Sequence, residues 1–263
     1  SGYDIERSFM EILYLTLFFI FGSIMGSFFY VIAVRVTKGE SILKPRSHCE
    51  KCGHILKWYE LIPIISFLIQ GGKCRNCKTK LNIGYIFMEI CTGVLFAVCY
   101  HVFGLSLNLL VALIFVSSLI ITIISDIEYM VILDEVLITA ILGIIVVYLF
   151  NIGIRETAIK VLSATGSFIT MLAIKKMGDI MFKQESLGGG DIKLMFLIGL
   201  VLGYPLSICN IFLATFIAFP IALVMLITNK DNIIPFGPFL SMAALTLFVS
   251  GITFSEIINY LIR

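Results

Sequence analysis

The sequence predicts an all-α polytopic membrane protein of about eight transmembrane helices, with a small zinc-ribbon-like cytosolic insertion between the first two spans. Of its 263 residues, 59% are hydrophobic and only 14% are charged, whereas soluble domains have about 45–50% and about 25%. Long apolar runs recur along the chain, and one polar segment containing two cysteine pairs interrupts them. This composition excludes a soluble globular protein, a disordered chain, a collagen and a coiled coil.

A spanning helix is expected wherever roughly 20 mostly apolar residues follow one another with almost no charge. Two runs are short, and the first of them is expected to recruit flanking residues. A Gly-Tyr-Pro break at 203–205 separates two spans, and Gly251 is expected to interrupt the last. The N-terminal run is expected to be a retained span, because it is too long for a signal peptide and lacks a basic region. The predicted spans are 9–34, 84–103, 105–125, 136–150, 157–174, 192–202, 204–228 and 236–262, with seven as the alternative count.

The predicted spans divide the chain into three parts. Residues 1–34 form the N-terminal segment and first span, residues 35–83 the polar cytosolic segment, and residues 84–263 the main transmembrane bundle. The polar segment is where the metal-binding residues are expected, and the bundle is where the candidate catalytic residues lie.

The basic residues predict the orientation in the membrane. The segment 35–83 holds ten Lys or Arg against three Glu, which places it in the cytoplasm by the positive-inside rule. If eight spans cross the membrane in alternating directions from this cytoplasmic segment, fifteen of the 19 basic residues, Lys230 among them, lie on the cytoplasmic side. Both termini then lie outside. The basic segment lacks the aromatic pattern of a nucleic-acid site, so its expected partner is anionic lipid and not nucleic acid.

Four of the seven cysteines form a predicted metal site. Two Cys-x-x-Cys pairs are separated by 21 residues, the spacing of a zinc ribbon. Because all four ligand positions would be filled by sulfur, the zinc would be structural. Unliganded or redox-active thiols are the alternative interpretation. The pairs are Cys49 with Cys52 and Cys74 with Cys77, and the tight turns beside them are expected at Gly53, Gly71 and Gly72.

Two aspartates at the ends of predicted spans are the candidate catalytic residues. Asp126 ends the third span, and Asp191 begins the sixth after Gly188, Gly189 and Gly190. Carboxylates within spans are rare and are functional candidates by default. The predicted threading puts both at the cytoplasmic edge of the bilayer. There they could share a proton, one activating water while the other polarises a carbonyl, as in aspartic proteases. Helix capping at an interface is the alternative, especially for Asp191.

The surrounding residues have weaker signals. The three glycines are expected to break the helix and let a substrate backbone approach. Lys193 is expected either to bias the aspartate pair or to reach the lipid headgroups. Glu89 and His101, in or near the second span, are expected to make ordinary polar contacts rather than catalyse. Asp134 and Glu135 are expected to cap the fourth span.

Taken in order, these motifs resemble those of the bacterial type IV prepilin peptidases, membrane aspartic proteases of the GxGD class. The resemblance covers nearly the whole chain. One position departs from it, because Leu133 stands where the family usually has proline. The matching stretches are Gly22 to Phe28, the two cysteine pairs with Ile62-Pro63, Ser66 and Gly72-Lys73-Cys74, Asp126 with Asp134, Gly188 to Asp191 with Lys193-Leu194, and Ile234 to Phe239.

The resemblance implies a concrete activity. Such enzymes cut the basic leader from prepilins and pseudopilins after a glycine, on the cytoplasmic side of the bacterial inner membrane. Many then methylate the new N-terminal residue, typically phenylalanine, with S-adenosylmethionine. That activity is associated with the cysteine-bearing segment, and Gly72 and Lys73 are the candidate cofactor-binding residues. Two alternatives stay open, namely a peptidase without methylation and a non-catalytic zinc-ribbon scaffold or transporter.

Overall fold

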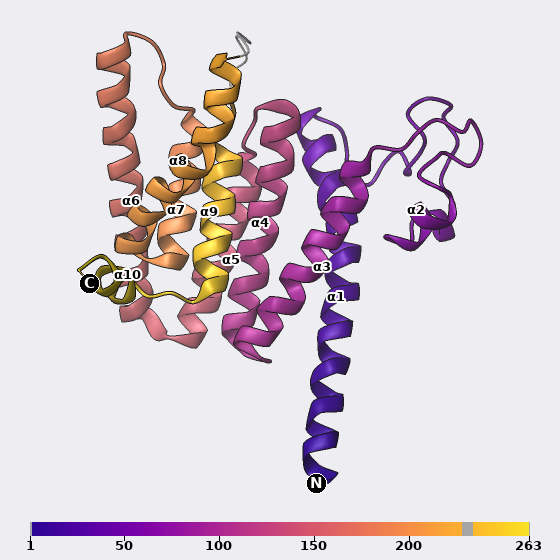
Figure 1. Ribbon diagram of the computed structural model, residues 1–263, viewed down its shortest axis with the longest axis horizontal. Coiled ribbons are helices and arrows are strands. Elements are labelled where there is room, and N and C mark those ends of the chain that lie inside the picture. Colours follow the sequence, from indigo (N-terminus) through magenta and orange to yellow (C-terminus); the bar gives the residue numbers. More distant parts are fainter. Residues whose placement is uncertain (1, 228–233, 263) are drawn as a thin grey trace. The chain divides into compact units, whose positions relative to one another are not determined.

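The computed structural model describes residues 2–227 and 234–262. Within these residues the chain forms ten α-helices and one short 3-10 helix (Figure 1). Lys230, which entered the predicted orientation, lies outside the described residues. The helices are α1 Gly2–Thr37, η1 Trp58–Glu60, α2 Ile65–Ile69, α3 Ile83–Phe103, α4 Leu107–Tyr129, α5 Asp134–Asn151, α6 Gly153–Phe182, α7 Gly189–Leu202, α8 Tyr204–Ile227, α9 Gly237–Ser250 and α10 Phe254–Ile262.

Each predicted span corresponds to a helix. Among the described residues, six helices are long and apolar enough to cross a membrane, namely α1, α3, α4, α5, α6 and α8. The helices α7 and α9 have 14 residues each, which at 1.5 Å per residue is about 21 Å, less than the roughly 30 Å of a hydrocarbon core. The short run at 136–150 does recruit its flanks in α5, and Gly251 ends α9 with a φ of 64° before α10 begins.

The chain forms two compact units, residues 1–109 and 110–263. The first unit is built on α1 and α3, which lie side by side. Glycines allow this approach, since a Cβ on Gly22 would meet the backbone of α3 and one on Gly93 would meet Phe19 and Ser23. Small residues that let two backbones come close are typical of helix pairs in membranes. The glycine-rich motif in the first span therefore has a packing role. The division of the chain at residues 34 and 83 into three parts stays a prediction.

The second unit is built around α7. This helix packs against α5, α6, α8 and α9, and its residues from Asp191 to Val201 are mostly buried. A Cβ on Gly199 would meet Ser167 and Ala164 of α6, so α6 and α7 are in close contact. Because α7 is surrounded, its sequence after Lys193 is apolar on all sides. The polar residue at its beginning, Asp191, is thereby held in the interior of the unit.

Candidate active site and metal centre

Asp126 and Asp191 come together in the second unit. Asp126 lies near the end of α4, and Asp191 lies in the first turn of α7. Both residues are 6% exposed, and their carboxyl groups are close enough for the charges to interact. The two aspartates that the sequence singled out therefore lie near each other in this unit, and their role as a catalytic pair stays a prediction. Two carboxyl groups in one partly dry site do not both ionise readily, so this arrangement would allow the pair to share a proton.

Backbone groups from two other segments hold the pair. The N–H of Gly237, the first residue of α9, donates to the carboxyl group of Asp126. The N–H of Gly188 donates to Oδ2 of Asp191 at 3.2 Å. In the described structure the other oxygen of Asp191, Oδ1, is buried and accepts no hydrogen bond. A buried polar atom without a partner requires an explanation, and this oxygen could accept a hydrogen bond from a bound molecule.

Ile132 closes the site from the loop between α4 and α5. A Cβ on Gly190 would lie 2.8 Å from Cβ of Ile132, and a Cβ on Gly237 would lie 3.0 Å from its Cδ1. The same Cβ on Gly237 would also press on Oδ2 of Asp126. Gly190 and Gly237 are therefore glycines because the site has no room for a side chain at either position.

The three glycines before Asp191 do not break a helix. Helix α7 begins at Gly189, and only Gly188, its N-cap, has an extended backbone, with φ −67° and ψ 146°. The expectation of a helix break was wrong, because this segment is itself a helix start. A Cβ on Gly189 would meet nothing within 4 Å, so an open space lies beside Gly189. The role of these glycines in admitting a substrate backbone stays a prediction.

Lys193 does not bind the aspartate pair. Its Nζ donates to both oxygens of Asp134, at 2.8 and 2.6 Å, and joins α7 to α5. Both side chains are about half exposed. The expectation that Asp134 caps α5 was wrong as well, because the N-cap position is Leu133 and has no side-chain cap. Asp134 and Glu135 lie in the first turn of α5, where acidic residues favour the helix dipole.

Lys175 of α6 is a residue near the site that the sequence analysis counted only for orientation. Its Nζ donates to the carbonyl of Leu187 at 2.8 Å, and its charge interacts with that of Asp191. The same loop is held by Asp179, which accepts hydrogen bonds from the N–H and hydroxyl of Ser186 at 2.7 and 2.9 Å. Charged residues four positions apart at the end of a span, just before the Gly-Gly-Gly-Asp motif, are the signal that could have revealed this anchor.

The four cysteines of the first unit form one cluster. Their Sγ atoms lie within 4.8 Å of one another, with Cys49 to Cys77 at 3.8 Å and Cys52 to Cys74 at 4.0 Å. Sulfurs about 2.3 Å from a tetrahedral zinc would be about 3.8 Å apart, so the cluster fits a zinc ion. Hydrogen bonding to the side chain and backbone of Thr79 lowers the pKa of the Cys77 thiol to about 6. That favours the thiolate, the form that binds metal.

Matching backbone turns shape the two halves of the cluster. In the first half, the N–H of Gly53 donates to the carbonyl of Cys49 at 2.8 Å; in the second, that of Lys78 donates to the carbonyl of Cys74 at 3.0 Å. Gly53 has a φ of 69° and Lys78 one of 57°. In the second half this turn is made by Lys78. Gly71 and Gly72, with φ of 61° and 66°, form the expected tight turn just before Cys74.

Gly72 and Lys73, the candidate cofactor-binding residues, lie beside the cluster. Gly72 has a φ of 66°. Its N–H donates to the carbonyl of Phe67 at 2.9 Å, and its own carbonyl accepts from Leu81 at 2.8 Å. Because the N–H of Gly72 already makes a hydrogen bond to Phe67, it could not donate to a ligand. Gly72 could instead let a ligand come close to the backbone, since it has no side chain. The side chain of Lys73 is exposed and could meet the carboxylate of a ligand such as S-adenosylmethionine.

The two remaining polar candidates make ordinary contacts, as expected. Oε2 of Glu89 accepts a hydrogen bond from the N–H of Ile64 at 2.7 Å. Nδ1 of His101 lies 3.3 Å from Oε1 of Glu11, and both side chains are exposed.

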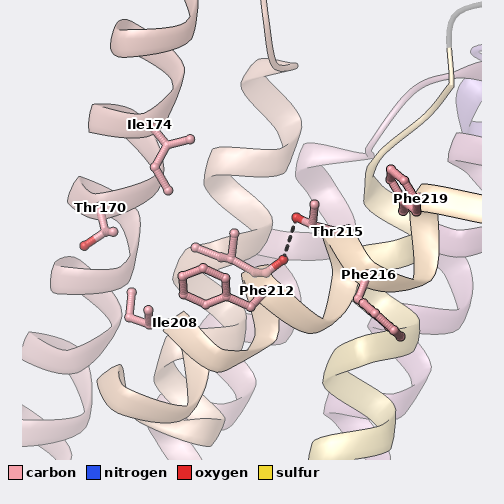
Figure 2. Close-up of a pocket in the computed structure, with 8 residues that line it drawn as sticks. Thr170, Ile174, Ile208, Phe212, Thr215, Phe216 and Phe219 are labelled. Atoms are coloured by element: carbon pink, nitrogen blue, oxygen red, sulfur yellow. Dashed lines mark hydrogen bonds between the residues drawn. The ribbon is translucent and has the colours of Figure 1, made fainter. Parts of the chain in front are cut away.

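A groove of about 570 Å³ between α6 and α8 is a separate feature of the second unit (Figure 2). It holds no acid, base or cysteine, so it offers no chemistry. Its apolar lining suits contact with lipid chains. The lining residues are Thr170, Ile174, Ile208, Ile211, Phe212, Thr215, Phe216 and Phe219.

Comparison with known proteins places this site in a family. A family model described as "Bacterial Peptidase A24 N-terminal domain" matches residues 20–103, and one described as "Type IV leader peptidase family" matches residues 113–223. A Bacillus subtilis protein named "Prepilin leader peptidase/N-methyltransferase" is 33% identical over 252 residues, covering 95% of this chain and 98% of the relative. The chain belongs to the type IV leader peptidase family. It is a multi-pass membrane protein.

Other members of the type IV leader peptidase family bear the same name. The Myxococcus xanthus protein is 32% identical over 187 residues, which are 71% of this chain and 56% of the relative. The Neisseria gonorrhoeae protein is 29% identical over 223 residues, which are 84% of this chain and 76% of the relative. No solved structure matches the chain.

Proposed function

We propose that this protein cleaves the basic leader of type IV prepilins or pseudopilins with Asp126 and Asp191, and then methylates the new N-terminus. The observation that carries the proposal is the pair of buried carboxyl groups on α4 and α7, in a chain of the type IV leader peptidase family. A non-catalytic scaffold would have no need of two adjoining acids kept from water, because burying charge without function is costly.

Cleavage follows from the geometry of the pair. One carboxylate takes a proton from a water bound between the two acids, and that water attacks the scissile carbonyl. The other carboxyl group donates a hydrogen bond to the carbonyl oxygen and then gives its proton to the leaving amine. The N–H groups of Gly237 and Gly188 keep the carboxyl groups in place. Oδ1 of Asp191 is the proposed contact of the shared proton, since it has no other partner in the described structure.

Methylation belongs to the cysteine-bearing lobe of the first unit. S-adenosylmethionine would supply the methyl group. As the uncharged amine of the cleaved pilin forms the new N–C bond, the S–CH3 bond of the donor would break, S-adenosylhomocysteine would leave, and the amine would lose a proton. Gly72 and Lys73 are the proposed contacts of the methyl donor. A zinc ion held by Cys49, Cys52, Cys74 and Cys77 would keep the lobe folded, because so short a polar segment buries little apolar surface of its own.

The site is proposed to face the cytoplasm. The support is the excess of basic residues in the segment 35–83 and the positive-inside rule, with the bacterial inner membrane as the location. The proposed partners are the apolar N-terminal helix of the substrate and the surrounding lipid.

Purified protein in lipid vesicles, given a prepilin with a basic leader, tests the proposal. Wild type should release the leader, and the mature product should be 14 Da heavier when S-adenosylmethionine is present. Asp126→Asn and Asp191→Asn should each lose at least about 10³-fold in turnover, and the double variant should be no worse than either single one. Cleavage by Asp126→Asn at the wild-type rate would refute the dyad. A product without the added mass would leave a peptidase that does not methylate.

A further inference from the structure

The cytosolic lobe contains a backbone turn that its own sequence does not favour. Ile64 has φ 62° and ψ −54°, and the N–H of Ile65 donates to the carbonyl of Pro63 at 2.6 Å. This is the geometry of a classic γ-turn, which is rare and strained. A β-branched residue with positive φ is an outlier, and such outliers persist only where the surroundings impose them.

The group that imposes this turn is a carboxyl group on a transmembrane helix. Oε2 of Glu89 accepts the N–H of Ile64 at 2.7 Å, and the side chain of Ser27 on α1 also hydrogen bonds Glu89. Glu89 is only 7% exposed. It therefore joins α1, α3 and the turn at one buried point within the first unit.

Helix α2 connects this turn to Gly72. Ile64 is the N-cap of α2, and the N–H of Gly72 donates to the carbonyl of Phe67 in that helix. A Cβ on Gly72 would lie 3.0 Å from the Phe67 ring. None of the five residues of α2 is buried, so packing contributes little to its position. The contact with Glu89 supports the beginning of α2 from a buried point of the first unit.

We propose that Glu89 is a positioning residue: its carboxyl group holds the turn at Ile64 and, through α2, sets Gly72 for methyl transfer. The second half of this inference rests on the proposed methylation, and the first half does not. In this role Glu89 acts as a hydrogen-bond acceptor. Its charge is not needed, because the neutral amide oxygen of a glutamine can accept a hydrogen bond from the same N–H in the same geometry.

Amide hydrogen exchange of the full-length protein tests the anchor without any substrate. In Glu89→Ala the amide of Ile64 should exchange at least tenfold faster, and in Glu89→Gln within threefold of wild type. Glu11→Ala is the matched control, because Glu11 is an exposed carboxylate on α1 that contacts His101, and its exchange at Ile64 should be unchanged. If the amide of Ile64 exchanges at the wild-type rate in Glu89→Ala, the carboxyl group of Glu89 does not hold the turn and the proposal fails.

Single-turnover assays test the consequence. Glu89→Ala should lose at least tenfold in methyl transfer and stay within threefold in leader cleavage, whereas Glu89→Gln should retain both. The double variant Ile64→Gly/Glu89→Ala should regain most of the methyl transfer, because glycine adopts positive φ without strain. Equal loss in Glu89→Gln and Glu89→Ala would assign Glu89 a charge-dependent role and refute positioning. If wild type transfers no methyl group, the methylation proposal fails, and the exchange measurement still decides the anchor.

Discussion

Replacing Gly237 by alanine should disable the aspartate pair with little damage to the fold. The new Cβ would lie 2.5 Å from Oδ2 of Asp126 and 3.0 Å from Cδ1 of Ile132. Ordinary contact begins at 3.4 Å. The Ile132 methyl is the end of a flexible side chain and can rotate away. The Asp126 carboxyl group must move by about 1 Å, and it must then leave the Gly237 N–H or crowd Asp191.

The size of the effect follows from that displacement. A misplacement of about 1 Å can cost about 10²-fold in rate, or about 2.7 kcal/mol of transition-state stabilisation. The fold should lose about 1–3 kcal/mol, as for other overpacked sites. We therefore expect Gly237→Ala to lower the turnover of leader cleavage about 100-fold while the protein remains folded.

The assay compares steady-state cleavage and thermal unfolding in detergent for three proteins. Gly143→Ala is the matched control, since its Cβ would meet Ile114 of the same unit at an ordinary 3.5 Å, in the interior of α5, where alanine is favoured over glycine by about 0.5–1 kcal/mol. It should cleave like wild type and be at least as stable. Wild-type turnover in Gly237→Ala would show that Asp126 tolerates the displacement and would refute the proposed geometry of the site.

Three further outcomes are expected. Gly189→Ala should raise stability by up to about 1 kcal/mol but raise KM in cleavage, because its Cβ enters a space open to substrate; an unchanged KM would place the substrate elsewhere. Lys175→Met should lower the rate of cleavage about tenfold, because it releases the Leu187 carbonyl. Lys193→Met loses only an exposed ion pair with Asp134. It should cost about 0–1 kcal/mol of stability and keep the rate of cleavage within threefold. Cys74→Ser should lose bound zinc by elemental analysis and lose methylation before cleavage, whereas Cys91→Ser, outside the cluster, should keep the metal; loss of cleavage with methylation spared would reverse the assignment of the two activities.

The helices and the cysteine cluster could be predicted from sequence because each depends on local patterns. A charge-free run of sufficient length indicates a span, and the spacing of two Cys-x-x-Cys pairs indicates that the four sulfurs come together. Even the departure at Leu133 is understood from its backbone. Its φ is −76° and its ψ is 114°, within the range that proline would fix, so another residue can adopt the same turn.

The partners of the charged side chains could not be predicted, because they depend on the tertiary arrangement. Lys193 and Asp134 are 59 residues apart and meet only because α7 packs on α5. Glu89 and Ile64 are 25 residues apart, and their contact requires a γ-turn for which isoleucine has no preference. Sequence singled out Lys193, Asp134 and Glu89 but not Ile64, and the fold determines which group each of them contacts.

Glycine shows the same limit within a single motif. In the run before Asp191, Gly188 is extended, Gly189 borders open space, and Gly190 packs on Ile132. The three glycines thus have three different surroundings: the N-cap position of α7, an open space, and a close contact with Ile132. A side chain at each should fail in a different way, through the cap, through substrate binding and through the geometry of the pair. The three positions are separated only by the fold, through the N-cap position of Gly188 and the contact that Ile132 makes with Gly190 from outside the motif.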